Sequence, residues 1–271
     1  MPSLYVVATP IGNLEDISLR ALRVLRQVEL IAAEDTRKTR RLLEAYDIKT
    51  PLTSYYEHNK NSKLGYILEK LAQGDVAIVS EAGVPGISDP GYELVVAAAE
   101  QSIPVVPIPG ASAVTAALSV AGLPTDRFSY IGFLPRKAGD RKRLLQSVIN
   151  EPGSIIVLEA PHRLQAVLVD ILDVLGDRRL AVCRQLTKRH EEVFRGTVSQ
   201  AMERFARPKG EFTLVIEGWK NEVGPQLTAE VEQRLAQLRQ SGETAKEAVA
   251  AVAGETGLSR KELYRAWLRL A

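Results

Sequence analysis

The sequence of 271 residues contains one cysteine, Cys183, and few aromatic residues. A single thiol excludes an internal disulfide and a zinc site built on cysteines, and it is typical of a reducing cytoplasm. We expect Cys183 to be a small buried apolar residue. No apolar run approaches the roughly 20 residues that span a bilayer, and the N-terminal segment lacks the features of a secretion signal. The sequence therefore predicts a soluble cytoplasmic protein that makes no contact with a membrane.

Several catalytic signatures are also missing. There is no GxxxxGK[ST] loop, no HExxH motif and no GxSxG elbow. The three histidines, His58, His162 and His190, are far apart in the sequence, so we expect no metal site. The segment ATPIGN has one glycine where a dinucleotide fingerprint has three. These absences argue against a P-loop NTPase, a metalloprotease, a serine hydrolase and an NAD-dependent dehydrogenase.

Basic residues are locally clustered, although the net charge is only +2, from 35 basic and 33 acidic residues. Four clusters stand out: Arg37, Lys38, Arg40 and Arg41; Arg136, Lys137, Arg141, Lys142 and Arg143; Arg178, Arg179, Arg184, Lys188, Arg189 and Arg195; and Arg260, Lys261, Arg265 and Arg269. One such cluster alone is usually a solvated face. Four of them in a nearly neutral protein favour a segregated surface that binds phosphates.

The first 118 residues alternate between strand, loop and helix four times. Short apolar runs at 4–8, 29–33, 76–80 and 104–110 are each followed by a polar or glycine-rich loop and then by a helical pattern. This alternation predicts an α/β domain, 1–118, with a mostly parallel sheet. Ligands of such sheets bind at the carboxyl ends of the strands. We therefore expect the loops 9–13, 34–37, 80–91 and 109–112 to converge on one edge of this sheet.

The loop 80–91, SEAGVPGISDPG, is the most unusual of the four. Gly83, Gly86 and Gly91 permit backbone conformations that other residues avoid, and Pro85 and Pro90 stiffen the path. The result is a rigid wall that exposes backbone N–H and C=O groups, which suits a flat ligand with polar edges such as adenosine. Loop 109–112 offers a second approach lined by small residues, with Ser112 as a natural helix cap.

The pattern of strands and helices changes after residue 118. Residues 119–219 predict a second, α+β domain with a mixed or antiparallel sheet. The polar segment 220–226 predicts a linker, and the C-terminal domain, 220–271, is expected to be helical and to resemble a helix-turn-helix. Two capping boxes, Thr244 with Glu247 and Ser259 with Glu262, mark two of its helix starts.

Six segments resemble a known family. They are YVVATPIGNLEDISLRALRVL, IAAEDTRKTRRLL, VSEAGVPGISDPGYELV, PIPGASAVTAALSVAGLPTDRFSYIGFLPRK, LEAPHRL and GEFTLVIEG. Over residues 3–219 the sequence is similar to the ribosomal RNA small-subunit methyltransferase I family of the tetrapyrrole methylase superfamily. The resemblance implies two α/β domains with an S-adenosylmethionine (SAM) cleft between them, a small C-terminal helical domain and a homodimer. It also implies methyl transfer to the ribose 2′-hydroxyl of a decoding-centre cytidine, nucleotide 1402 of 16S rRNA. The small ribosomal subunit is the expected partner, and the sequence leaves open whether the substrate is the assembled subunit or naked RNA.

The resemblance also implies site residues. The expected SAM-binding residues are Pro10, Ile11, Gly12, Glu81, Val84, Gly86, Ser112, Ala113, Leu158, Glu159 and Phe212. The family typically has SDAGTPG where this chain has SEAGVPG, so the contacts made by Glu81 and Val84 are expected to differ from those of its relatives. The expected RNA-binding residues are Lys38, Arg40, Arg136, Lys137, Arg141, Lys142 and Arg143.

A ribose hydroxyl attacks a methyl group well only when its proton is accepted. Glu34 and Asp35, at a strand end, are the candidates for base or orienter, and Arg37 can hold a phosphate or the carboxylate. The alternative is that Asp35 and Arg37 cap a helix and pair locally.

Two other functions are alternatives. A C-methylase of a tetrapyrrole precursor would share the SAM cleft. A DNA-binding regulator would read DNA with its C-terminal helices, but residues 225–271 carry seven basic and six acidic residues, which is a weak basis for binding DNA. We therefore expect no DNA partner, and expect these helices to help dock the ribosomal particle.

Overall fold

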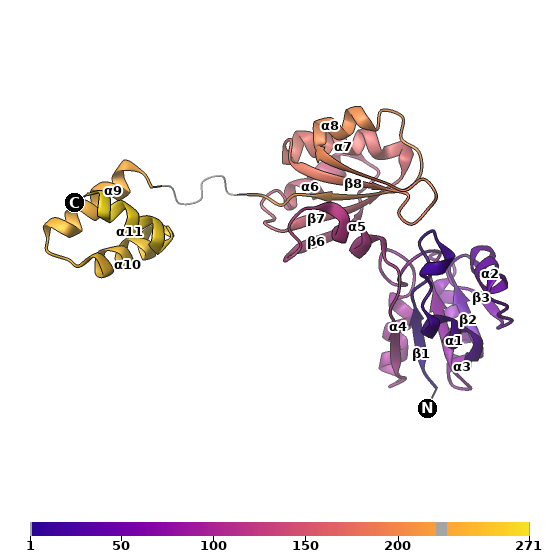
Figure 1. Ribbon diagram of the computed structural model, residues 1–271. Helices are drawn as coiled ribbons and strands as arrows, with labels where there is room; N and C mark the ends of the chain where they lie inside the picture. Colours follow the sequence, from indigo (N-terminus) through magenta and orange to yellow (C-terminus); the bar gives the residue numbers. More distant parts are fainter. Residues whose placement is uncertain (1, 221–226, 271) are drawn as a thin grey trace. The chain divides into compact units, whose positions relative to one another are not determined.

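The computed structural model describes residues 2–220 and 227–270. The chain forms two compact units, residues 1–219 and 220–271, which are described separately (Figure 1). Most of the expected linker, 221–226, lies outside the described residues. In the described ranges no helix has the length and apolar character needed to cross a bilayer.

The first unit contains a parallel sheet followed by a mixed sheet. The parallel sheet comprises β1 (Leu4–Val7), β2 (Leu30–Ala33), β3 (Leu52–Ser54), β4 (Val76–Val79) and β5 (Val105–Ile108) in the order β3-β2-β4-β1-β5. Every paired neighbour is parallel, which confirms the predicted sheet type. The three residues of β3 were not predicted, because so short a strand has no readable alternation.

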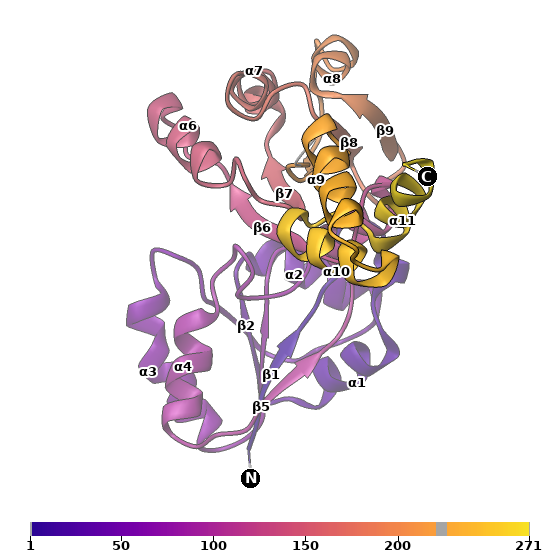
Figure 2. The same cartoon turned by 90° about the vertical axis from the view of Figure 1, so that its left-hand side faces the viewer.

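Helices cover both faces of the parallel sheet, as Figure 2 shows. They are α1 (Leu19–Gln27), α2 (Thr36–Ala45), α3 (Lys60–Leu71) and α4 (Tyr92–Glu100). Alternate strand residues point to opposite faces: Ala77 and Val79 pack with α1 and α2, and Val76 and Ile78 pack with α3 and α4. Both faces are therefore buried, and β2 and β4 are apolar at every position.

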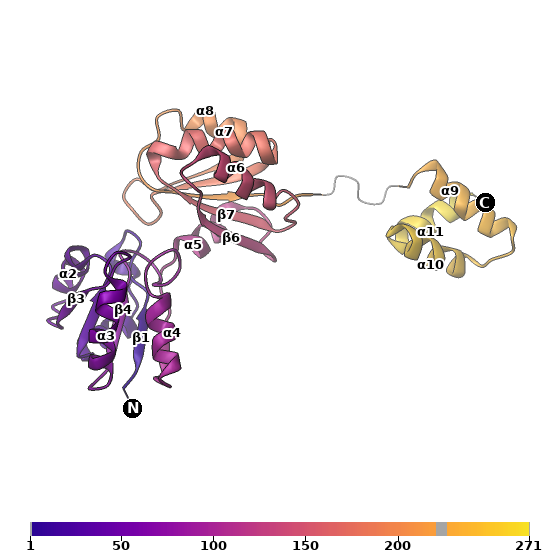
Figure 3. The ribbon, with the colours of Figure 1, turned by 180° about the vertical axis from the view of Figure 1, so that it is seen from behind.

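The mixed sheet comprises β6 (Phe128–Phe133), β7 (Ser154–Glu159), β8 (Arg179–Arg184), β9 (Glu192–Thr197) and β10 (Phe212–Ile216) in the order β6-β7-β10-β8-β9. Only the β6–β7 pair is parallel, which confirms the expected mixed sheet. Helices α6 (Ala138–Ser147), α7 (Leu164–Leu175) and α8 (Val198–Arg204) cover one face (Figure 3), and α5 (Ala113–Ala121) packs on the other. The boundary at 118/119 stays a prediction, and the helix that spans it packs on this second sheet.

The C-terminal unit consists of α9 (Ala229–Gln240), α10 (Ala245–Thr256) and α11 (Arg260–Arg269) around a core that includes Leu235, Val252 and Leu263. The capping box at Thr244 and Glu247 is confirmed. The second is only half formed, because Ser259 accepts from the Glu262 N–H while the Glu262 side chain accepts from the Ser259 hydroxyl and not from its N–H. These three helices have a small core of their own.

Candidate active site

Loops at the carboxyl edge of the parallel sheet are joined by hydrogen bonds. The Thr9 and Gly83 backbones exchange two, at 2.8 and 3.0 Å, which tie loop 9–13 to loop 80–91. The Glu81 N–H donates to Glu34 Oε2 at 2.9 Å, which ties loop 80–91 to loop 34–37. The fourth loop, 109–112, follows β5, which pairs with β1. The expected convergence on one sheet edge is confirmed, because parallel strands end at the same side.

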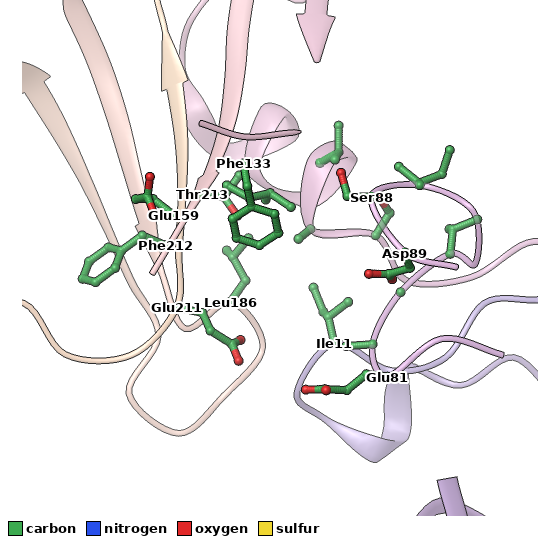
Figure 4. Close-up of a pocket in the computed structure, with 18 of the residues that line it drawn as sticks. Ile11, Glu81, Ser88, Asp89, Phe133, Glu159, Leu186, Glu211, Phe212 and Thr213 are labelled. Atoms are coloured by element: carbon green, nitrogen blue, oxygen red, sulfur yellow. The ribbon is translucent and has the colours of Figure 1, made fainter. Parts of the chain in front are cut away.

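A cavity of about 390 Å³ opens between this edge and the mixed sheet (Figure 4). From the first sheet's loops and α5 it is lined by Ile11, Glu34, Glu81, Ala82, Gly83, Val84, Ile87, Ser88, Asp89, Ser112, Ala113 and Val114. From the mixed sheet and its loops it is lined by Tyr130, Phe133, Leu158, Glu159, Ala160, Pro161, Cys183, Leu186, Glu211, Phe212 and Thr213. We call it the main cavity.

Loop 80–91 forms a stiff wall of the main cavity. Gly83 and Gly91 have φ angles of +91° and +150°, and a Cβ on Gly91 would lie 3.1 Å from the Gly86 backbone nitrogen. Ser88 also adopts a positive φ, of 63°, and its Oγ lies 2.6 Å from the Tyr130 hydroxyl on β6. This hydrogen bond connects loop 80–91 to the mixed sheet, and the Thr9–Gly83 hydrogen bonds connect it to loop 9–13.

The loop wall is acidic. Figure 4 shows Asp89 and Glu81 projecting from it into the main cavity, and Glu34 lines the same side. Burial raises the pKa of Asp89 to about 7, and the negative charge of Glu34 adds to the rise. No described cation forms an ion pair with Asp89. This carboxyl group therefore changes its charge close to neutral pH.

The opposite wall is mostly apolar and includes Phe133, Leu158 and Leu186. Burial raises the pKa of Glu159, although its Oε1 accepts from the Ala160 N–H and pairs with Arg163 at 3.3 Å. The other oxygen, Oε2, is buried and has no partner. Burial raises the pKa of Cys183 to about 11, which keeps it a neutral thiol and agrees with the expected buried apolar role.

Most of the residues expected to bind SAM line the main cavity. Eight of the eleven do so: Ile11, Glu81, Val84, Ser112, Ala113, Leu158, Glu159 and Phe212. Pro10, Gly12 and Gly86 do not. A Cβ on Gly12 would lie 2.5 Å from the Lys188 side chain, so Gly12 packs against the loop after β8. Ser112 occupies the N-cap position of α5, but its side chain makes no capping hydrogen bond, so the predicted cap is wrong.

The three residues expected to serve catalysis are placed differently. Glu34 lines the main cavity, whereas Asp35 and Arg37 do not. Asp35 caps α2, because its Oδ1 accepts from the backbone N–H of Arg37 at 2.8 Å and of Lys38 at 3.3 Å. It also pairs with the Arg37 guanidinium at 3.4 Å. Although burial opposes the change, these hydrogen bonds lower the pKa of Asp35. The catalytic role of Glu34, Asp35 and Arg37 stays a prediction.

One expected RNA-binding residue is buried. Arg141 is only 6% exposed; its guanidinium pairs with Asp170 at 2.5 Å and donates to the Pro135 and Arg136 carbonyls. It stabilises the junction between β6 and α6 and does not face solvent, so its assignment to RNA binding is wrong. The sequence could not distinguish it from its neighbours, because only the tertiary structure brings Asp170 beside it.

The other expected RNA-binding residues lie at the surface. Lys142 pairs with Asp173 at 2.9 Å and Arg143 with Asp140 at 3.5 Å, and Lys38 pairs with Glu81. Arg40, Arg136 and Lys137 are exposed. All six side chains remain available to phosphates, because the ion pairs of Lys38, Lys142 and Arg143 are weak surface pairs.

Several residues of the site were missed. Asp89 lies in loop 80–91, where the glycines and prolines indicate a backbone wall and give no sign that this carboxyl group faces a cavity. Tyr130, Phe133 and Leu186 come from the mixed sheet, and no local pattern marks them. Among the described residues, no three His, Cys, Asp or Glu side chains are grouped to hold a metal ion.

Comparisons with known proteins agree with this geometry. The family of Tetrapyrrole (Corrin/Porphyrin) Methylases matches residues 3–202, and the RsmI C-terminal HTH domain matches residues 225–271. Ribosomal RNA small subunit methyltransferase I from Synechocystis is 49% identical, with 100% of this chain and 99% of the relative covered. The protein of that name from Halalkalibacterium halodurans is 45% identical, with 97% and 93% covered.

A solved structure shares the fold. The crystal structure of uroporphyrin-III C-methyl transferase from Thermus thermophilus, complexed with S-adenyl homocysteine, matches with a TM-score of 0.57. It is 18% identical and covers 79% of this chain and 97% of its own. At this identity the likeness concerns the fold alone.

Proposed function

Since this chain belongs to the tetrapyrrole methylase family, among the ribosomal RNA small subunit methyltransferases I, we propose that it is a SAM-dependent RNA methyltransferase. Its substrate is the ribose 2′-hydroxyl of the decoding-centre cytidine, nucleotide 1402, of 16S rRNA. The observation that carries the proposal is the main cavity, which has an acidic loop wall facing an apolar wall.

The residues of the main cavity fit SAM. Its volume of about 390 Å³ lies within the range of sites that enclose a small molecule. The apolar side, with Leu158, Leu186 and Phe212, suits an adenine ring. The loop-wall carboxylates suit a ligand with positive charges. When bound, SAM supplies an activated methyl group.

Two carboxylates in the first sheet's loops support a role in accepting the proton. The 2′-hydroxyl must lose its proton as it is methylated, and a base works best when its pKa is near the operating pH. Asp89, with a pKa of about 7, meets this condition. Glu34 contributes by raising the affinity of Asp89 for a proton, and it is the second acceptor on this wall.

The proposal is tested by methyl transfer from labelled SAM to assembled small subunits, to naked 16S rRNA and to a tetrapyrrole precursor, with the modified nucleotide mapped. We expect transfer to the ribose of the decoding-centre cytidine. Transfer to the tetrapyrrole alone, or to a base atom of the RNA, would contradict it.

The proposed partners are the small ribosomal subunit and a second copy of the chain in a cytoplasmic homodimer. The C-terminal unit is proposed to dock the ribosomal particle. Deleting residues 225–271 should then reduce methylation of assembled subunits while SAM binding is retained. Full activity of the truncated protein on assembled subunits would show that the C-terminal unit has another role. Light scattering of the purified protein tests the dimer.

A further inference from the structure

A second cavity, of about 290 Å³, lies at the same sheet edge. It is lined by Thr9, Pro10, Leu14, Lys38, Thr39, Arg41, Leu42, Ser80 and Glu81. Glu81 also lines the main cavity, so the two cavities share one side chain. Since one water molecule occupies roughly 30 Å³, the second cavity has room for about ten waters, which is more than a single ion needs.

The interior of the second cavity combines apolar side chains with hydroxyl groups. Pro10, Leu14 and Leu42 supply apolar contacts. The hydroxyl residues are buried: Thr39 is 4% exposed and Ser80 is 2% exposed. The Ser80 side chain also lies close enough to the Asp89 carboxyl to lower the pKa of that group. The second cavity therefore combines an apolar lining with hydroxyl-bearing residues.

The rim of the second cavity is basic. Lys38 and Arg41 come from the first turns of α2 and lie exposed. Lys38 pairs with Glu81, which places this ion pair where the two cavities meet. Surface ion pairs of this kind are weak, so a phosphate can replace Glu81 as the partner of Lys38. A ligand with a planar polar part and an anionic part fits the whole site.

We propose that the second cavity receives the base of the nucleotide whose ribose is methylated, with Lys38 and Arg41 on its phosphate. Enzymes that act on a nucleotide commonly draw it out of its stack into a pocket. Placing the base in the second cavity puts the ribose at Glu81, on the border of the main cavity. The hydroxyl-bearing residues of the lining, Thr9, Thr39 and Ser80, then lie beside the base. This inference rests on the proposed function.

The test compares Arg41→Ala with Arg23→Ala, an exposed arginine of α1 that lines neither cavity. Losing one phosphate contact should raise the KM for small subunits about tenfold and lower the salt dependence of binding. The kcat and the SAM dissociation constant should stay within about twofold. Arg23→Ala should leave all these quantities unchanged. Equal KM values for the two variants would overturn the proposal.

A second measurement uses the free protein. Cytidine 5′-monophosphate, titrated in an NMR experiment, should shift the signals of Thr39 and Ser80, and Arg41→Ala and Ser80→Ala should each weaken this binding. Shifts confined to residues of the main cavity would contradict the proposed subsite. If the wild-type protein methylates the mapped cytidine but the variants bind the mononucleotide normally, only the subsite is wrong. If the mononucleotide binds as expected but RNA is not methylated, the proposed function is wrong.

Discussion

The two sheets of the first unit contribute to the main cavity in different ways. The parallel sheet contributes through the loops that follow its strands, and these supply three carboxylates: Glu34, Glu81 and Asp89. The mixed sheet contributes mainly through side chains at strand ends and nearby loops, such as Leu158 and Phe212, most of which are apolar. One wall therefore carries three carboxylates, and the other is mostly apolar apart from Glu159 and Glu211.

This difference follows from topology. In a parallel sheet every strand ends at the same side, so its loops gather there and are free to carry polar residues. In the mixed sheet, β7 and β8 run antiparallel to β10, so their C-terminal residues lie beside the start of β10. Leu158 pairs with Thr213 and Cys183 pairs with the same residue from the other side. The wall that results is part of a packed sheet.

The largest effect is expected from the charge of the acidic wall. Asp89→Asn should lower kcat by about 10²- to 10⁴-fold, the usual contribution of a general base, and Asp89→Glu should restore part of it. Glu211→Gln, a carboxylate on the opposite wall that pairs with Lys188, should cost less than about tenfold. If Asp89→Asn and Glu211→Gln lowered kcat by similar factors, the two walls would not differ in chemistry.

The proposed role of Asp89 also predicts how kcat and the melting temperature depend on pH. A base must be deprotonated, so kcat should rise with pH through about 7, where Asp89 loses its proton, and Asp89→Asn should lack this rise. Because the folded pKa is raised above the ordinary value of 3.8, Asp89 reduces stability as pH rises from about 4 to about 7. The melting temperature of wild type should thus fall more than that of Asp89→Asn across this range.

The next largest effect is expected on the free energy of unfolding, from a substitution beside the mixed sheet. Arg141→Ala leaves Asp170 buried without its main partner, which typically costs about 3 kcal/mol; the nearby Lys142, at 3.4 Å from Asp170, keeps the loss at this lower end. Arg143→Ala removes an exposed pair and should cost under about 0.5 kcal/mol. Urea unfolding measures both. A stable Arg141→Ala that binds RNA poorly would restore its original assignment.

A smaller effect is expected from the hydrogen bond that joins the two walls. Tyr130→Phe removes the partner of Ser88, whose φ is positive, and a neutral hydrogen bond contributes about 1 kcal/mol. The dissociation constant of SAM should therefore rise about fivefold, as measured by calorimetry. Tyr66→Phe, on the exposed face of α3, serves as the control. An unchanged constant would show that the walls are held without this bond.

The smallest effect is expected at the two positions where the loop differs from the family pattern. Glu81→Asp shortens the side chain that pairs with Lys38, and Val84→Thr adds a hydroxyl at the rim of the main cavity. An exposed ion pair contributes under about 1 kcal/mol, so SAM affinity should change less than about fivefold for either. A larger change would place one of these side chains in direct contact with a charged part of SAM.

Patterns local in the sequence determined much of the first half of the molecule. Alternation of apolar strands with glycine- and proline-rich loops predicted a parallel sheet with four loops at one edge, since strand and helix periodicities depend on near neighbours. The same reasoning located the main cavity's loop wall and Glu34. Local patterns also led to errors: the cap expected from Ser112 does not form, because a good capping residue still needs the right side-chain orientation.

Only the tertiary structure decided how residues distant in the sequence meet. It placed Asp170 beside Arg141 and so removed a basic residue from the RNA-binding set, and it brought Phe133 and Leu186 to face loop 80–91. It also surrounded Asp89 with buried surface and the Glu34 charge, which together move its pKa toward neutrality. The sequence by itself determined most of the elements, β3 excepted, and the loop that forms the cavity wall. Long-range packing decides which side chains are buried away from water and which charged groups become neighbours. Burial and neighbouring charge together set the chemistry of the site.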